Sequence, residues 1–193
     1  VGGAGNDQIT IAAYGADAVS GSVQSVATRI VTGDNARILF DVAGGMTDVI
    51  STDVRQATGG NDVIRIGKTG STTGLGVNFV IGGMGNDSIF IAGDVDAATK
   101  RVTTGTGTSQ DVILGDSGEI HRTALTNKML QVTSTQADKG GDDQIVTGHG
   151  ASVIVGGFGS DTIAAGDGTG IALGDNGGLN YDSQAGNGVL REV

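Results

Sequence analysis

The sequence predicts an all-β protein, a β-solenoid in which short strands stack on one another and loops are inserted between them. Glycine supplies 37 of the 193 residues, and proline and cysteine are absent, a composition typical of many tight turns. Isoleucine, valine and leucine recur between the glycines, as short strands require. One glycine-rich phrase also occurs three times, in segments 2–10, 82–90 and 156–164.

The repeated phrase has the pattern G-G-x-G-x-D-x-U-x, in which U is a large aliphatic residue. From Asp138 onward such nine-residue windows are contiguous, and upstream they recur with insertions between them. They start at Gly2, Gln24, Gly33, Ala57, Thr73, Gly82, Thr106, Gly115, Asp138, Thr147, Gly156, Ala165 and Gly174. Five windows form one unit of about 80 residues. We expect one solenoid over 1–193, made of a partial unit 1–56, a unit 57–137 and a shorter, truncated unit 138–193, cut from a longer protein.

The eighth position of the first four window types forms an aliphatic column. Its members are Ile9, Val31, Ile64, Val80, Ile89, Ile113, Ile145, Ile154 and Ile163, with Ala172 as the exception. Stacked strands bury such a column between neighbouring coils. The fifth window begins Gly-Asp and places its apolar residues elsewhere, at Ile38, Phe40, Ile120, Leu179 and Tyr181. We therefore expect its turn to be built differently.

These windows resemble the calcium-binding nonapeptide repeats of the RTX family, and the resemblance covers most of the chain. It implies that six residues of each window form a turn and three form a strand, and that two windows make one coil of a parallel β-roll. It also implies that Ca²⁺ lies between turns stacked on the same edge, held by aspartate side chains and backbone carbonyls. Calcium takes six to eight oxygen ligands, and glycine lets carbonyls turn inward with no Cβ in the way.

The candidate calcium ligands are the aspartates at the sixth position, the asparagines before them and the aspartates of the Gly-Asp windows. They are Asp7, Asp62, Asp87, Asp111, Asp143, Asp161, Asn6, Asn61, Asn86, Asp116 and Asp175. Aspartate also favours ordinary Asx turns, but complete phrases in register favour calcium. Because alternate windows lie on opposite edges of a β-roll, we expect most of the calcium on the edge that carries Asp62, Asp87, Asp143 and Asp161. The opposite edge has Arg29, Asn78, Ser152 and Gly170 at this position, and only Asp111 is acidic there.

The net charge of −10 makes nucleic acid and anionic membranes poor partners, since both bind basic surfaces. A divalent cation is a better partner. With no cysteine, no disulfide can hold this loop-rich chain together, and no run of about 18 apolar residues is available to span a membrane. The insertions 11–23, 42–56, 91–105 and 124–137 are expected to project from the stack.

Two features suggest other chemistry. Ser117 lies in the sequence Gly-Asp-Ser-Gly, which is similar to the sequence around a protease nucleophile, and His121 is close to it in sequence. The aligned windows carry asparagine at the position of Ser117, which indicates a variant of the repeated turn and not a catalytic serine. His121 and His149 are too few for a zinc site and are expected to be solvated. Ice binding would need a regular threonine row, and a polysaccharide-binding module would need more exposed aromatics. Because neither a catalytic triad nor a zinc site is indicated, we predict that the chain is not an enzyme.

The leading functional expectation is a calcium-stabilised structural segment of a large bacterial surface, biofilm or filament-forming protein, located outside the cell. Its partners would be calcium, further repeats of the same chain or other copies of it, since solenoids grow by stacking. The alternative is a calcium-triggered folding and export block of a secreted RTX toxin or enzyme. The domains that flank the segment would distinguish the two.

Overall fold

A computed structural model describes residues 1–193 except 12–27, 68–75, 97, 105–107, 183–188 and 193. In this described part the protein is all-β, without a helix, and its strands form four sheets, here named A to D. No helix long and apolar enough to span a membrane occurs among the described residues. The insertion predicted at 11–23 lies almost wholly outside them.

Sheet A consists of the strands that directly follow the aspartate-containing turns. It contains β1 (Gln8–Ile11), β5 (Val63–Ile66), β7 (Ser88–Ile91), β13 (Gln144–Val146) and β15 (Thr162–Ala164). Every neighbouring pair is parallel, and the strands follow one another in sequence order. Equivalent residues pair, as Ile64 does with Ile9 and Ile89. The predicted repeat register is therefore confirmed in this sheet.

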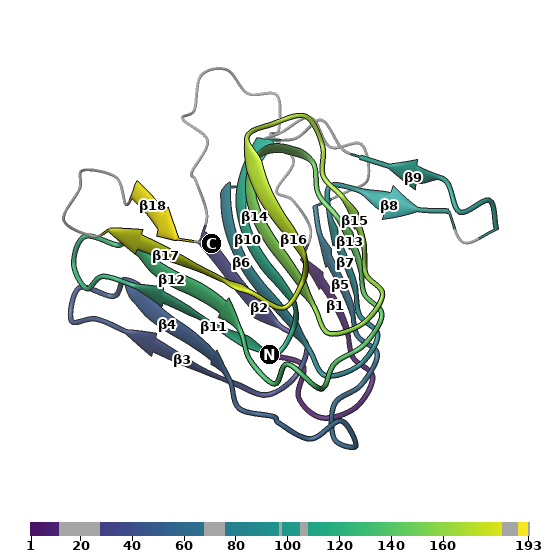
Figure 1. Cartoon of the computed structure of the whole chain (residues 1–193), viewed down its shortest axis with the longest axis horizontal. Coiled ribbons are helices and arrows are strands. Elements are labelled where there is room, and N and C mark those ends of the chain that lie inside the picture. The colour runs from purple at the N-terminus through teal and green to yellow at the C-terminus, as the bar shows by residue number, and fades with distance from the viewer. Residues whose placement is uncertain (12–27, 68–75, 97, 105–107, 183–188, 193) are drawn as a thin grey trace.

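Sheet B is the second parallel sheet, and the chain enters it after each strand of sheet A (Figure 1). It contains β2 (Thr28–Thr32), β6 (Gly76–Gly83), β10 (Thr108–Asp116), β14 (His149–Gly157) and β16 (Gly170–Asp175). All of its neighbouring pairs are parallel and in sequence order. One strand of each sheet makes one coil, so five coils stack in the order of the sequence.

The predicted aliphatic column is the first hydrophobic core, which lies between sheets A and B. The core cluster contains Val31, Ile64, Val80, Ile89, Ile113, Ile145 and Ile154, with Ile9 and Ile163 packed against it at the two ends. Ile64, Val80 and Ile89 have no exposed surface. The column that the nine-residue period predicts is confirmed, because branched side chains from successive coils pack directly on one another.

Sheet C differs from the other two sheets, because all its neighbouring strands are antiparallel. It contains β3 (Ala36–Phe40), β4 (Met46–Ser51), β11 (Gly118–Arg122), β12 (Met129–Ser134), β17 (Gly178–Asp182) and β18 (Val189–Glu192). Each Gly-Asp window opens one hairpin of this sheet. The protein is therefore not one stack of short parallel strands, and a third, antiparallel layer has to be added to the predicted solenoid.

The hairpins also correct the prediction for the insertions. Segments 42–56 and 124–137 do not project, because they contain β4 and β12 of sheet C. The small sheet D, made of β8 (Asp94–Val95) and β9 (Val102–Thr103) within segment 91–105, does stand out from the body (Figure 1). The difference is physical: β4 and β12 carry buried Met46, Val49 and Val132, whereas Val102 is exposed.

A second hydrophobic core lies between sheet C and the outward face of sheet B. Phe79, Val112 and Val155 of sheet B pack in it against Ile120 and Leu179 of sheet C. Along the second half of its central strands sheet B is thus packed on both faces, which explains the short apolar runs there, such as Phe79-Val80-Ile81. Among the fifth-window residues, Ile120 and Leu179 have no exposed surface, whereas Phe40 is 58% exposed.

The large unit in the sequence has a geometric cause. A hairpin adds two strands to sheet C, and two coils add two strands to each of sheets A and B. Strands in any sheet lie about 4.8 Å apart. One hairpin for every second coil therefore keeps the three sheets in step, and the alternation of Gly-Gly and Gly-Asp windows provides this.

Candidate metal centre

The candidate site is the edge where the chain passes from sheet B to sheet A or into a hairpin of sheet C. At the end of β6 and in the turn that follows it, Gly83 and Gly85 have φ angles of +123° and +119°. The equivalent glycines of the turns at 2–7 and 156–161 are also left-handed. A side chain would strain the backbone at these positions. The glycines at the second and fourth positions of the phrase are therefore required by backbone conformation.

The aspartates of successive turns form a continuous ladder along this edge. The backbone N–H of Asp7 donates to Asp62 Oδ1 at 2.7 Å, and that of Asp62 donates to Asp87 Oδ1 at 2.8 Å. The ladder continues from the Asp87 N–H to Asp143 Oδ1 at 2.7 Å and from the Asp143 N–H to Asp161 Oδ1 at 2.9 Å. Five of the candidate ligands thus lie in one column. In four of them, Asp62, Asp87, Asp143 and Asp161, the Oδ1 atom accepts a hydrogen bond from the neighbouring coil and holds the two coils in register.

The other carboxylate oxygen of each aspartate has no such partner. The Oδ2 atoms of Asp7, Asp62, Asp87, Asp143 and Asp161 are all buried, and no described protein group forms a hydrogen bond with them. Buried carboxylate oxygens are normally hydrogen-bonded or bound to a metal. A column of five such atoms in equivalent positions is therefore a chemical feature of this edge rather than an isolated defect.

The first glycine of each turn leaves a space that brings two oxygens together. A Cβ on Gly82 would lie 2.1 Å from the Gly115 carbonyl oxygen and 2.4 Å from Asp87 Oδ2. A Cβ on Gly2, Gly33, Gly115 or Gly156 would likewise lie 2.1–2.6 Å from the carbonyl oxygen of the next turn's first glycine and from an aspartate Oδ2. That aspartate belongs to the same window at Gly2 and Gly156, and to the window after the hairpin, as Asp62 and Asp143, at Gly33 and Gly115. Glycine is therefore required at this position because the oxygens occupy the space of a side chain.

Electrostatics at this edge disfavour ionised carboxylates in the absence of a cation. Burial, followed by the Asp143 carboxylate, raises the pKa of Asp87 to about 10. Burial raises the pKa of Asp143 to about 9 and also raises the pKa values of Asp62 and Asp161. A divalent cation among these groups would offset both causes, because it neutralises the charge and replaces lost hydration.

The Gly-Asp turns add further carboxylates at the same edge. Asp116 Oδ1 accepts the Gly141 N–H at 3.0 Å, and its Oδ2 accepts the Phe158 N–H, so it joins two successive turns. Burial raises the pKa of Asp116 to about 7. Asp175 is the last residue of β16, the end strand of sheet B, and is exposed.

Asp34 occupies the position equivalent to Asp116 but is absent from the candidates chosen from the sequence. Its Oδ2 accepts the Met84 N–H at 2.6 Å, and its Oδ1 is buried without a partner. Burial raises its pKa to about 6, although the Met84 hydrogen bond opposes the shift. The signal was present in the sequence, since Gly33-Asp34 aligns with Gly115-Asp116.

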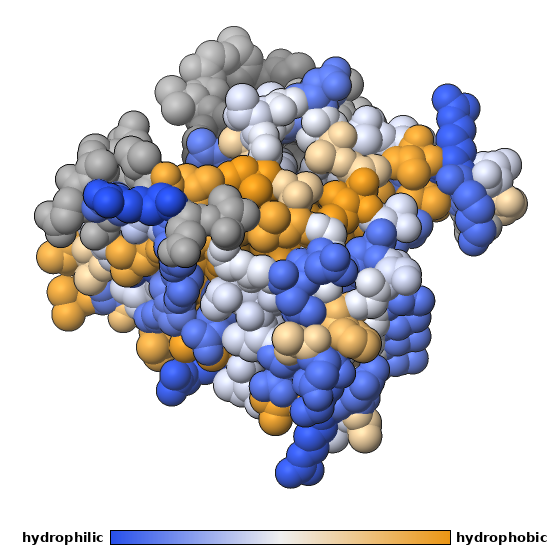
Figure 2. Space-filling view, viewed as in Figure 1, coloured by the Kyte–Doolittle hydropathy of each residue, from blue (hydrophilic) through white to orange (hydrophobic). Residues whose placement is uncertain are grey.

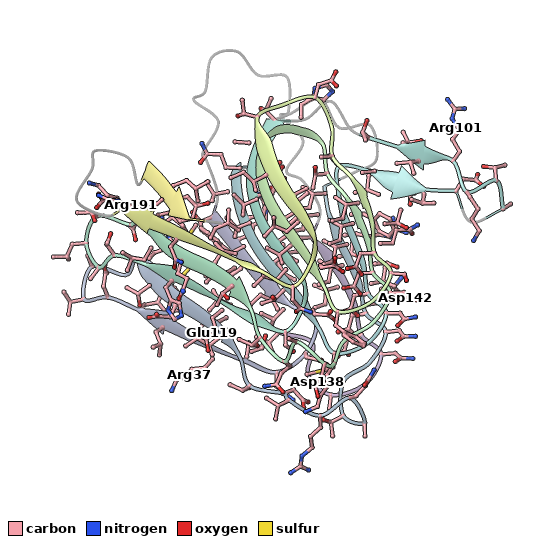
Figure 3. All side chains as sticks on the ribbon, viewed as in Figure 1. Arg37, Arg101, Glu119, Asp138, Asp142 and Arg191 are labelled. Carbon is pink, nitrogen blue, oxygen red and sulfur yellow. The ribbon has the colours of Figure 1, made fainter. Side chains whose placement is uncertain are left out.

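The candidate asparagines form a second ladder outside the first. Asn6 Oδ1 accepts the Asn61 N–H, Asn61 Oδ1 accepts the Asn86 N–H, and Asn86 Oδ1 accepts the Asp142 N–H. The three asparagine side chains are exposed, and Asp142 projects from the same edge (Figure 3). The structure places these oxygens in coil-to-coil hydrogen bonds on the surface, away from the buried Oδ2 column.

The opposite edge contains Asp111 and none of the other candidate ligands. Arg29, Asn78, Asp111, Ser152 and Gly170 stand side by side in sheet B, as the window alignment predicts. Asp111 Oδ1 accepts the Asn78 amide at 2.7 Å, and its Oδ2 accepts the Ser109 hydroxyl at 2.8 Å. Burial raises the pKa of Asp111, and these two hydrogen bonds oppose the shift. Its carboxylate is thus satisfied without an ion.

The catalytic arrangement considered for Ser117 and His121 is not formed. Ser117 is buried, and its hydroxyl donates to the Asp53 carbonyl at 3.5 Å. His121 lies between Asp48 Oδ1 at 2.6 Å and Glu119 Oε2 at 2.8 Å. Burial lowers the pKa of His121, but the hydrogen bonds and charges of the two carboxylates outweigh it, so the net shift is upward. The prediction of a solvated His121 is wrong.

The donor set fits calcium only if backbone carbonyls take part. Within the part of the chain that the structure describes, no three His, Cys, Asp or Glu side chains converge to hold a metal by themselves. Each turn of the column offers one unpartnered carboxylate oxygen beside a glycine carbonyl. Calcium accepts such mixed oxygen ligands, whereas zinc prefers nitrogen and sulfur.

Comparisons with protein-family models, curated proteins and solved structures found no match to this chain.

Proposed function

We propose that this chain is a calcium-stabilised structural segment of a large extracellular protein, of the bacterial surface, biofilm or filament-forming kind. The observation that carries the proposal is the column of five buried Oδ2 atoms without partners, each of which borders, together with a glycine carbonyl oxygen, the space beside a glycine Cα. Calcium would sit along this column, held by Asp7, Asp62, Asp87, Asp143 and Asp161 with the carbonyls. It would supply positive charge where the fold concentrates negative charge.

Calcium suits this column better than the other common divalent cations. Calcium–oxygen distances are about 2.3–2.6 Å, whereas magnesium requires about 2.0–2.1 Å and usually keeps several waters. The Oδ2 atoms are buried, which favours the ion that loses water more readily.

The stacked coils support a β-roll of the RTX type with an added layer. Two nine-residue windows make each coil, and the aspartate turns all lie at one edge. The hairpins of sheet C take the place of direct turns in alternate coils. We interpret them as an elaboration that buries the outward face of sheet B and stiffens the rod.

A structural role fits the use of the acidic groups better than catalysis does. The ladder carboxylates bind backbone N–H groups of neighbouring coils, so they are already committed to the stack. Sheets A and B end in the strands β1, β15, β2 and β16, each of which has one unpaired edge in the described structure. Such edges accept further coils of the same kind, whether from the same chain or from another copy.

The experiment is a calcium titration of the metal-free chain followed by far-ultraviolet circular dichroism and thermal melting. We expect weak β signal in EGTA and full β signal in millimolar calcium, because ions that bind only the folded state stabilise it by mass action. Magnesium at the same concentration is the control and should be much less effective. Full β signal and an unchanged melting temperature in EGTA would contradict a structural role for calcium.

A further inference from the structure

A groove of about 540 Å³ lies outside the aspartate edge, between sheet B and the hairpins of sheet C. Its floor is a row of apolar side chains that stand side by side on sheet B, namely Phe79, Val112, Val153 and Ile171. In the space-filling view, apolar residues gather in a band across the middle of the face shown (Figure 2). The volume is within the range of about 300–1,000 Å³ that is usual for small-molecule sites.

The roof of the groove comes from sheet C and contains a cation. Met129 and Tyr181 line it together with Arg122, whose guanidinium carbon lies 5.0 Å from the centre of the Phe79 ring. The Arg122 Nε–H and one Nη–H donate to the Asn127 carbonyl, and another Nη–H donates to the Met46 carbonyl at 3.4 Å. The guanidinium has five N–H groups, so donors remain for a ligand.

The charge of Arg122 has no acidic counterpart in the described structure. None of the ion pairs among the described residues includes Arg122. Asp111 also lines the groove, but Asn78 and Ser109 hold its two oxygens. Burial lowers the pKa of Arg122, as expected for a cation that has lost water without gaining an anion.

We propose that this groove binds an amphiphile with an apolar chain and an anionic head, of the class of a long-chain carboxylic acid. The apolar chain would lie over Val153 and Ile171, the half-buried part of the row, where it removes apolar surface from water. The carboxylate would meet the free donors of Arg122, a charge-assisted pairing that guanidinium favours. The binding is independent of the proposed calcium function, because none of the residues that line the groove belongs to the aspartate column.

The test is isothermal titration calorimetry of the calcium-loaded chain with decanoate below its micelle concentration. Decanol and decyltrimethylammonium serve as neutral and cationic probes with the same chain length. We expect decanoate to bind roughly tenfold more tightly than decanol, since one charge-assisted hydrogen bond contributes about 1.4 kcal/mol or more. Equal affinity for decanoate and decanol, or no binding of decanoate, would overturn the proposal.

Two variants locate the site. Arg122→Gln keeps hydrogen-bond donors but removes the charge, and we expect it to lose the preference for decanoate over decanol. Arg101→Gln is the matched control, because Arg101 lies on the projecting hairpin of sheet D (Figure 3), and it should bind like the unaltered chain. Ala151→Phe fills the groove from an exposed position on the floor and should abolish decanoate binding. This variant tests the site even if Arg122→Gln does not fold. Undiminished decanoate binding by either groove variant would refute this site.

Discussion

The two edges of the coil stack carry equally buried aspartates in opposite chemical situations. Asp87 is 1% exposed and Asp111 is 2% exposed. Asp111 receives hydrogen bonds from Asn78 and Ser109 on its two oxygens. Asp87 receives one from a backbone N–H on Oδ1, while its Oδ2 has no partner and lies beside the Gly115 carbonyl. Burial therefore does not by itself make a cation site, and the nature of the surrounding groups decides it.

The difference comes from the backbone at each edge. At the aspartate edge, glycines with positive φ and without Cβ bring carbonyl oxygens beside the carboxylates. At the opposite edge, polar side chains supply donors, and Arg29 continues the row through a hydrogen bond to Asn78. At the aspartate edge the carboxylate oxygens lie near carbonyl oxygens, and at the opposite edge they accept hydrogen bonds from side-chain donors. Only the first arrangement leaves buried carboxylate oxygens without a donor.

The largest expected effect is that acid replaces calcium at the aspartate edge. A carboxyl with a raised folded-state pKa contributes stability below its unfolded value of about 4 and loses it as pH rises toward the folded value, about 10 for Asp87. Metal-free protein should therefore melt at a higher temperature at pH 4 than at pH 8, and calcium at pH 8 should close the gap. Scanning calorimetry of the chelated, desalted chain measures this. A higher melting temperature at pH 8 without calcium would count against the aspartate column as the origin of calcium dependence.

The next effect separates the two edges by matched substitutions. Asp87→Asn keeps an acceptor for the Asp62 N–H and puts an amide beside the Gly115 carbonyl. It should stabilise the metal-free chain yet reduce the gain from saturating calcium by about 2.7 kcal/mol, the contribution of one site at hundredfold excess. Asp111→Asn should lower stability by about 1–3 kcal/mol through a lost acceptor and leave the calcium response unchanged. Urea unfolding at several calcium concentrations distinguishes them, and similar calcium responses in both variants would remove the distinction between the edges.

A smaller effect is expected from the glycine column. Gly82→Ala places a Cβ against the Gly115 carbonyl and Asp87 Oδ2, and we expect a loss of about 2 kcal/mol with weaker calcium binding. Gly174 is the matched control, because a Cβ there would meet nothing within 4 Å. Gly174→Ala should leave the unfolding midpoint within error of the unaltered chain. Equal losses of stability in the two variants would show that the close approach of the Gly115 carbonyl and Asp87 Oδ2 to Gly82 does not matter for the fold.

The smallest effect concerns His121, which lies in β11 of sheet C and belongs to neither ladder. His121 contacts Asp48 and Glu119 through its two ring nitrogens, an arrangement that requires the doubly protonated ring if both contacts are hydrogen bonds. Because its pKa is raised in the fold, the stabilisation is complete below about pH 6.5 and is lost as pH rises through the folded value. In calcium, His121→Gln should remove about 1 kcal/mol or less at pH 6 and nothing at pH 9. Nuclear magnetic resonance titration of His121 provides a direct check, and a downward pKa shift would exclude the arrangement.

Much of the repeated part of the fold could be predicted from the sequence. Each coil uses the same nine-residue phrase, so the register of Ile9, Ile64 and Ile89, and the collection of Asp62, Asp87, Asp143 and Asp161 on one edge, follow from alignment of the windows alone. A one-residue shift would turn every aliphatic side chain out of the core. Local periodicity was therefore sufficient for sheets A and B and for most of the aspartate column.

The third layer required the tertiary structure. Ile38, Ile120 and Leu179 occupy the same position of the three Gly-Asp windows, from which only a different turn was expected. The strands that follow pair with distant segments, as Glu119 does with Ile50, and no repeated phrase marks the partner. The sequence also did not show that the asparagine oxygens lie on the surface and the aspartate Oδ2 atoms inside, because both residue types are possible calcium ligands. The sequence by itself determined which residues repeat and therefore stack. Only the folded chain decided which oxygens are buried without donors, because that depends on the positions of backbone groups from neighbouring coils.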